Sequence, residues 1–162
     1  MTTNPRPPRG RPRTGARVAA VQALFQSEQT GDSAETVLDQ FVRHRIGALP
    51  GLGGFEEGRV PEADLPLFGA ILRGAAAKAE AVDAEIRAHL AKDWPFERLD
   101  PVLRALLRAA TAELLNAKDP PARVVINEYL DIAHGFLDAE ATRFANGVLD
   151  SLAHTLRPGE FQ

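Results

Sequence analysis

The stretch RFANGVLD, residues 143–150, contains an Asn-Gly pair between apolar residues. In many proteins such a pair is the strongest short-range signal for a β-hairpin turn. A hairpin needs apolar and polar residues that alternate on both sides of the turn. Here the apolar residues instead recur at spacings of three and four, at Ala141, Phe144, Val148, Leu149, Leu152 and Leu156. This spacing predicts a helix that runs straight through the pair.

Gly147 is then a glycine in the interior of a helix. Such a glycine costs about 1 kcal/mol relative to alanine, and the usual compensation is the close approach of another backbone. We therefore expect the preceding helix to cross this one at Gly147, with Asn146 as a hydrogen-bond partner at the crossing.

The same periodicity continues along most of the chain. It predicts six helical segments, at residues 14–30, 33–46, 64–91 with a kink near Gly74, 100–116, 120–136 and 138–156. Ser33, Asp100 and Asp138 are suited to N-cap three of them. No segment is typical of a strand, so the predicted fold class is all-α, with two small helical bundles packed together and six to seven helices.

The remaining segments lack this pattern. Residues 1–13 consist largely of Pro, Arg and Gly, which predicts a disordered arm ahead of one helical domain over residues 14–158 and a tail at 159–162. Residues 47–62 hold five glycines and two prolines and are expected to form a mobile loop. Their GLGG sequence is no phosphate cradle, because no strand precedes it and no Lys-Ser or Lys-Thr follows it.

The charge of the chain is segregated. The net charge is -3, but five arginines precede the first acidic residue, so the chain from Glu28 onward carries -8. These arginines are Arg6, Arg9, Arg11, Arg13 and Arg17. A basic arm on an acidic body favours either a polyanionic partner such as nucleic acid or a solubilising tail.

Catalytic and metal-binding patterns are missing from the sequence. There is no cysteine, and the four histidines, at positions 44, 89, 134 and 154, include no pair at metal-ligand spacing. No serine lies in a nucleophile elbow, and no apolar run approaches the roughly 20 residues of a membrane span. We expect a cytoplasmic protein without enzyme activity, cofactor, metal or membrane partner.

One polar pair lies in an apolar context. Asn127 and Glu128 occur within RVVINEYLDIAHGF, surrounded by aliphatic residues. An unpaired buried amide costs about 1–3 kcal/mol. We therefore expect Asn127 or Glu128 to bond a facing helix, a structural role rather than a catalytic one.

Three blocks together resemble a known family. VVINEYLDIAHGFLDAEATRFANGVLDSLA, residues 124–153, closely resembles the C-terminal signature of NusB, the bacterial transcription antitermination factors. ARVAAVQALFQSE, residues 16–28, resembles the first helix of that family, and LDPVLRALLRAATAELL, residues 99–115, resembles its fourth. The resemblance runs from about Arg13 to Pro158.

The resemblance implies an all-helical RNA-binding factor without catalytic activity. Members of this family pair with the small-subunit ribosomal protein NusE and hold single-stranded boxA RNA on the RNA polymerase antitermination complex during ribosomal RNA transcription. By resemblance, the RNA-binding positions here are Arg13, Arg17, Glu140, Arg143 and Phe144. By the same resemblance, Phe25 lies near the interface with the ribosomal protein.

Two properties of these residues agree with that role. Arginine pairs with phosphate through two hydrogen bonds, and an exposed aromatic ring offers a surface on which unpaired bases stack. Periodicity alone allows Phe144 to be either core or exposed; its neighbour Arg143 and the resemblance favour exposure.

Two alternatives to an antitermination factor fit the same residues. NusB-like domains also occur at the N-terminus of ribosomal RNA cytosine methyltransferases, although this chain has neither a cysteine nucleophile nor a dinucleotide-binding segment. The other alternative is a helical interaction scaffold without an RNA role. Direct RNA titration separates the scaffold from the RNA-binding factor.

Overall fold

The computed structural model describes residues 12–46, 63–116 and 119–161. These residues form seven α-helices and two short 3-10 helices, with no strand among them, which confirms the all-α prediction. The α-helices are α1 (Pro12–Thr30), α2 (Ala34–His44), α3 (Leu65–Ala77), α4 (Ala79–Ala88), α5 (Pro101–Asn116), α6 (Ala122–Phe136) and α7 (Ala139–Leu156). The 3-10 helices are η2 (Phe96–Arg98) and η3 (Pro158–Phe161). The arm before Pro12 and the glycine-rich segment 47–62 lie outside the described residues.

The helix starts follow the predicted caps. The side chain of Ser33 accepts a hydrogen bond from the backbone N of Thr36 at 3.2 Å, and that of Asp138 accepts one from Ala141 at 2.8 Å. The side chain of Asp100 accepts a hydrogen bond from the backbone N of Val102 at 2.8 Å. Each cap satisfies a backbone N–H that has no partner within its own helix, which fixes where these helices begin.

The segment expected to form one long helix is divided in two. The break lies at Lys78, which ends α3 and precedes α4, rather than at the predicted kink near Gly74. Lys78 has a non-helical φ of -114° and ψ of 30°, and its Nζ donates to Oδ1 of Asn116 at 3.0 Å. The break is therefore tied to the end of α5, a tertiary contact that local periodicity does not reveal.

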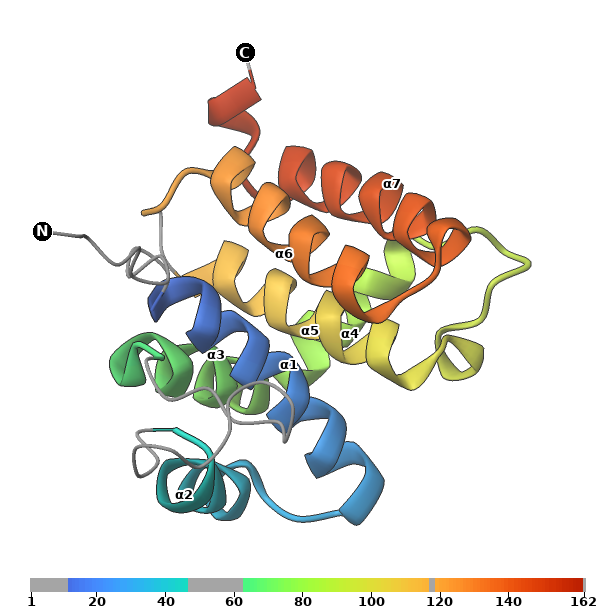
Figure 1. Ribbon diagram of the computed structural model, residues 1–162. Helices are drawn as coiled ribbons and strands as arrows, with labels where there is room; N and C mark the ends of the chain where they lie inside the picture. Colours follow the sequence, from blue (N-terminus) through green and yellow to red (C-terminus); the bar gives the residue numbers. More distant parts are fainter. Residues whose placement is uncertain (1–11, 47–62, 117–118, 162) are drawn as a thin grey trace, which may run out of the picture.

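Helix α5 lies at the centre of the fold. In Figure 1 it runs between α6 and α7 above and the pair α1 and α3 below, and it contacts all four of these helices. Helices α1 and α5 contact each other, and alanines on both are fully or almost fully buried, among them Ala16, Ala19, Ala20, Ala23, Ala105, Ala109 and Ala112. Small side chains allow two helix axes to approach closely. The two predicted bundles, α1 to α3 and α5 to α7, pack together through this alanine-rich contact.

Arg157 links the C-terminal end of α7 to the C-terminal end of α5 by hydrogen bonds. Its guanidinium donates to the carbonyl oxygens of Leu114 at 3.1 Å, Pro120 at 2.8 Å and Glu113 at 3.3 Å. The last carbonyls of a helix have no partner within the helix, so this one side chain satisfies groups that are buried at the end of α5. Glu160, three residues later, accepts a hydrogen bond of 2.7 Å from the backbone N of Ala122, the first residue of α6.

The helix through RFANGVLD is confirmed, but the expected crossing at Gly147 is wrong. Gly147 and Asn146 are both exposed, and a Cβ placed on Gly147 would meet nothing within 4 Å. Helix α7 instead packs through Ala145, Val148 and Leu149. The glycine therefore lies on the solvent side of α7, and its cost in helix propensity has no packing compensation among the described residues.

No helix formed by the described residues combines the length and the apolar character that a membrane span requires.

The open position of Gly147 leads to a stability prediction. We expect Gly147→Ala to raise the free energy of unfolding by about 0.5–1 kcal/mol in urea denaturation, because alanine is the better helix former and has room there. The matched control is Gly31→Ala at the end of α1, where φ is 79°. We expect that change to lower stability by about 1 kcal/mol. A destabilised Gly147→Ala protein would contradict the exposed placement.

Candidate nucleic-acid and protein interfaces

The start of α1 is held in place by three contacts. The hydroxyl of Thr14 donates to Oε1 of Glu128 on α6 at 2.7 Å, and the backbone N of Asp64 donates to the carbonyl of Pro12 at 2.8 Å. Arg17, one turn later, bonds α5 and α6. Arg13 itself is exposed and makes no hydrogen bond or ion pair with any residue in the described ranges. The backbone at Arg13 is therefore held in place, while its guanidinium contacts no charged partner among the described residues.

Arg17 is buried, contrary to the expectation that it faces RNA. Only 2% of its surface is exposed. Its Nε donates to Oε1 of Glu113 at 2.8 Å, its Nη2 to Oε2 of the same carboxylate at 2.5 Å, and its Nη1 to Oε1 of Glu128 at 3.1 Å. The hydroxyl of Tyr129 also donates to Glu113, at 2.9 Å. With its donors committed to these carboxylates, Arg17 is a structural residue, and the expectation of an RNA contact there does not fit its placement.

The electrostatics of this cluster keep its charges fixed. Burial by itself lowers the pKa of Arg17, but the hydrogen bonds and charge of Glu113 outweigh burial and raise that pKa. Burial, with the nearby charge of Glu113, raises the pKa of the Tyr129 phenol well above its usual value of 10.0. The guanidinium therefore stays charged and the phenol stays protonated, so each remains a hydrogen-bond donor near neutral pH.

Of the polar pair on α6, it is Glu128 that bonds a facing helix. Glu128 accepts from both Thr14 and Arg17 of α1. Asn127 is exposed and makes no hydrogen bond within the described parts of the chain. The periodic pattern could not decide between the two residues, because both lie at the border of the buried face of α6. Glu128 is half-buried there, whereas Asn127 is exposed.

The start of α7 presents a second group of expected RNA-binding residues. Glu140 and Arg143 are exposed, while Phe144 is half-buried and packs against the core rather than being open. The ring of Phe144 lies 5.2 Å from that of Trp94, at an interplanar angle of 40°. Trp94 is 48% exposed and belongs to the turn between α4 and α5. Trp94 is not among the residues that the resemblance assigns to RNA, although it stands out as the only tryptophan of the chain, in the linker KDWPFERL.

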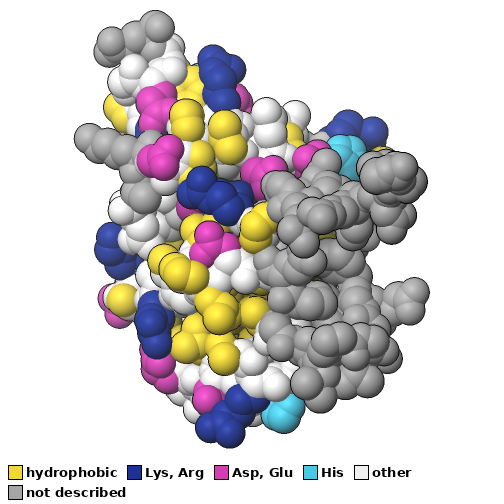
Figure 2. All heavy atoms as spheres, turned by 60° about the vertical axis from the view of Figure 1, so that its left-hand side comes forward, with side chains coloured by type: hydrophobic (Ala, Val, Ile, Leu, Met, Phe, Trp, Pro, Cys, Tyr) yellow, Lys and Arg dark blue, Asp and Glu magenta, His cyan; other side chains and the backbone are white. Residues whose placement is uncertain are grey.

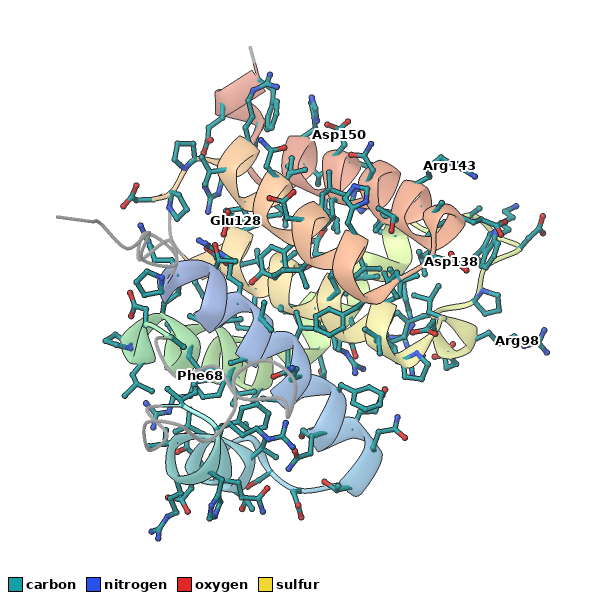
Figure 3. All side chains as sticks on the ribbon, viewed as in Figure 1. Phe68, Arg98, Glu128, Asp138, Arg143 and Asp150 are labelled. Atoms are coloured by element: carbon teal, nitrogen blue, oxygen red, sulfur yellow. The ribbon has the colours of Figure 1, made fainter. Side chains whose placement is uncertain are left out.

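The two groups of residues do not form one patch. In Figure 1, α1 begins at the left of the molecule, whereas α7 begins at its right. Figure 3 shows the same separation, with Glu128 beside the start of α1 and Arg143 near the opposite edge. When the left side is turned forward, basic and acidic side chains alternate among the described residues, and hydrophobic side chains gather in the lower half (Figure 2). The described residues on that face therefore form no broad field of positive charge.

Phe25 lies in a groove rather than on an open surface. It lines a cavity of about 360 Å³ together with Val21, Val102 and the 47% exposed ring of Phe136. A neighbouring cavity of about 420 Å³ shares Phe136 and Gln22 and continues toward the start of α1. Oε1 of Gln22 is buried without a hydrogen-bond partner among the described residues. Such a site, apolar with a few polar groups, is suited to binding another protein.

Groups of three or more residues that could hold a metal ion are not found among the described residues.

Comparisons with known proteins agree on one family. A sequence model of the NusB family matches residues 14–154. The transcription antitermination protein NusB of Granulibacter bethesdensis is 58% identical over 153 residues, which cover 94% of each chain. Its counterpart in Gluconobacter oxydans is 50% identical over 152 residues, covering 94% of this chain and 92% of that protein.

Two solved structures share the fold. NusB of T. maritima superposes with a TM-score of 0.72 at 28% identity and covers 99% of both chains. A crystal structure of the antitermination factors NusB and NusE in complex with double-stranded RNA gives a TM-score of 0.69 at 25% identity, covering 90% of this chain and 98% of that one.

The burial of Arg17 leads to a prediction about folding. We expect Arg17→Met to lower the free energy of unfolding by about 3–5 kcal/mol in urea denaturation, because Glu113 would remain as an unpaired buried charge. Adding Glu113→Gln should restore much of that loss, since the neutral amide oxygen can still accept the Tyr129 hydroxyl. Equal losses in the single and double variants would contradict this explanation.

The matched control is Arg73→Met, which breaks an exposed ion pair with Glu35 (Nε to Oε2, 2.7 Å). Exposed pairs contribute little, so we expect almost no change in stability.

Proposed function

The chain belongs to the NusB family, and we propose that it is a transcription antitermination factor that binds RNA together with a NusE-type ribosomal protein. The observation that carries this proposal is the family match over residues 14–154, which includes α1 from Thr14 onward and the start of α7. The function is one of binding rather than catalysis. Since bacterial transcription takes place in the cytoplasm, we infer a cytoplasmic location.

The alternative of a methyltransferase domain receives no support from the relatives. Those reported above are named as antitermination proteins, and the matches cover 94% and 92% of their own lengths.

We infer that RNA contacts the protein at Arg13 and near Arg143, with Glu140 beside the second contact. Both arginines are exposed and have no partner among the described residues, so binding a phosphate would break no existing ion pair. Arg17 is left out because its guanidinium is already bonded to Glu113. Two contacts at opposite sides of the fold favour an RNA that follows the surface over an RNA that docks at one point (Figure 1).

We further propose that the bound element is a single-stranded boxA-type RNA. Phe144 is half-buried beside a second ring that is widely exposed. Aromatic side chains bind the faces of bases that are not stacked in a duplex. The RNA in the similar NusB–NusE structure is double-stranded, so a competition between the two forms is part of the test.

For the ribosomal protein we propose the groove that contains Phe25. Its lining is mostly apolar, and the polar side chains of Gln26, Gln29 and Arg45 also line it. Buried aromatic anchors surrounded by polar groups are typical of protein interfaces. The RNA polymerase antitermination complex is the expected larger assembly.

The first prediction of this proposal concerns salt. Binding of a boxA-type single strand, measured by titration with the ribosomal protein present, should contain a contribution of about -1.4 to the log-log salt slope from Arg13 and Arg143, at roughly 0.7 per phosphate. We expect Arg13→Gln and Arg143→Gln each to flatten the slope by about 0.7.

Arg43→Gln on α2 is the matched control for these two changes, because that exposed arginine is paired with Asp39 and lies on neither proposed surface. RNA affinity that responds to neither Arg13→Gln nor Arg143→Gln would reject the two contacts. Equal binding of the duplex would reject the single-strand proposal.

The second prediction concerns the protein partner. We expect Phe25→Asp to weaken binding of the ribosomal protein at least tenfold, because it places a charge in an apolar groove. Calorimetric titration measures the affinity, and thermal unfolding checks the fold. Val42→Asp, at an exposed apolar position on α2, serves as the control. Unchanged affinity in a folded Phe25→Asp protein would reject the groove as the interface.

A further inference from the structure

The turn between α4 and α5 presents a large aromatic ring to solvent. Trp94 is 48% exposed, and its ring contacts the half-buried ring of Phe144, with the ring centroids 5.2 Å apart. Phe144 therefore has little free face of its own, while Trp94 has a wide one. Of the two rings, Trp94 is the better placed to receive a base.

Hydrogen bonds and a buried ring attach this exposed turn to the rest of the fold. The backbone N of Trp94 donates to the carbonyl of Ala91 at 2.9 Å, and Phe96 anchors the turn in the core at 5% exposure. Nη1 of Arg104 donates to the carbonyl oxygens of Phe96 at 3.2 Å and Leu99 at 2.9 Å. A ring on an ordered turn loses little further conformational freedom when a ligand stacks on it.

Two arginines near this turn have no acidic partner in the part of the chain that the structure describes. Arg98 and Arg143 are exposed and make no ion pair within the described residues, and Figure 3 shows both at the right-hand edge, pointing away from the helices. Two nearby carboxylates are already engaged, since Glu97 accepts from Arg87 at 2.5 Å and Asp138 caps α7. The other exposed charges of the linker 89–100 and of the first two turns of α7 are Lys92, Asp93, Asp100 and Glu140, and Asp100 caps α5.

We propose that Trp94 is the principal base-stacking residue of this protein for single-stranded RNA, and that Arg98 joins Arg143 in contacting the flanking phosphates. Phe144 then acts as the support that holds the indole ring in place. This inference rests on the proposed function in RNA binding and assigns that function to residues outside the matched RNA-binding positions.

Single-stranded RNA is the occupant that these features favour. An exposed ring between cationic side chains matches alternating bases and phosphates, whereas a duplex keeps its base faces stacked inside. A protein partner would favour a larger apolar surface, and here only the one ring is exposed in the turn that carries it.

The chain carries its own reporter for the test. Trp94 is the only tryptophan, so its fluorescence reports this turn alone. Titration of the full-length protein with an unlabelled boxA-type single strand should quench that emission in step with binding. We expect Trp94→Ala to weaken RNA affinity roughly 5- to 100-fold, and Trp94→Phe to retain most of it, because a phenyl ring still stacks. Arg98→Gln should flatten the log-log salt slope by about 0.7.

Two controls separate stacking from other effects. Val42→Ala removes part of an exposed apolar side chain on α2, and Arg43→Gln removes an exposed arginine there; both should leave affinity and slope unchanged. Thermal unfolding verifies that the Trp94 variants are folded.

The outcomes distinguish the inference from the function on which it rests. If Trp94→Ala binds RNA like the unaltered protein while Arg143→Gln weakens binding, the stacking role is overturned and the RNA function stands. If Trp94→Ala impairs binding of the ribosomal protein alone, the turn is a protein interface and the inference is likewise overturned. If the unaltered protein binds no RNA, with or without the ribosomal protein, both are overturned.

Discussion

The buried ion pair between Arg17 and Glu113 determines how the two halves of the molecule meet. A guanidinium with 2% exposure and a carboxylate with 4% are stable in the interior only because each satisfies the other's hydrogen-bonding groups. Tyr129 and Glu128 complete the cluster, so one side chain of α1 fixes both α5 and α6. The small side chains of the alanine-rich contact allow α1 and α5 to approach closely, while the ion pair fixes their relative position along the helix axes. A shift of α1 by one residue would leave both charges unpaired.

Most of the fold could be predicted from the sequence. The spacing of apolar residues identified the helices, and capping residues such as Ser33 and Asp138 located their starts. The division at Lys78 could not be predicted, because it depends on a contact with Asn116, far away in the chain. The helix crossing predicted at Gly147 was wrong for a related reason. A glycine inside a helix lowers helix stability, but the sequence does not show whether packing compensates for that loss.

The candidate site was predicted less well than the fold. Arg17 and Arg13 look alike in the sequence, and only the position of Glu113, on a distant helix, makes one buried and leaves the other exposed. Phe144 was expected to be open because the ring that covers it belongs to the linker between two other helices. Residue type thus suggested the chemistry correctly, whereas availability to a ligand depended on partners from elsewhere in the chain.

The position of Arg157 has a consequence for how the protein is made. Synthesis proceeds from the N-terminus, so α5 is complete long before the residue that satisfies its last carbonyl groups exists. Until Arg157 is added, the carbonyl oxygens of Glu113 and Leu114 must remain solvated, because burying an unsatisfied polar group costs about 1–3 kcal/mol each. Final closure around the end of α5 is therefore delayed until nearly the whole helical domain has been synthesised, and a nascent chain that stops at Leu156 keeps this part of its core open to water.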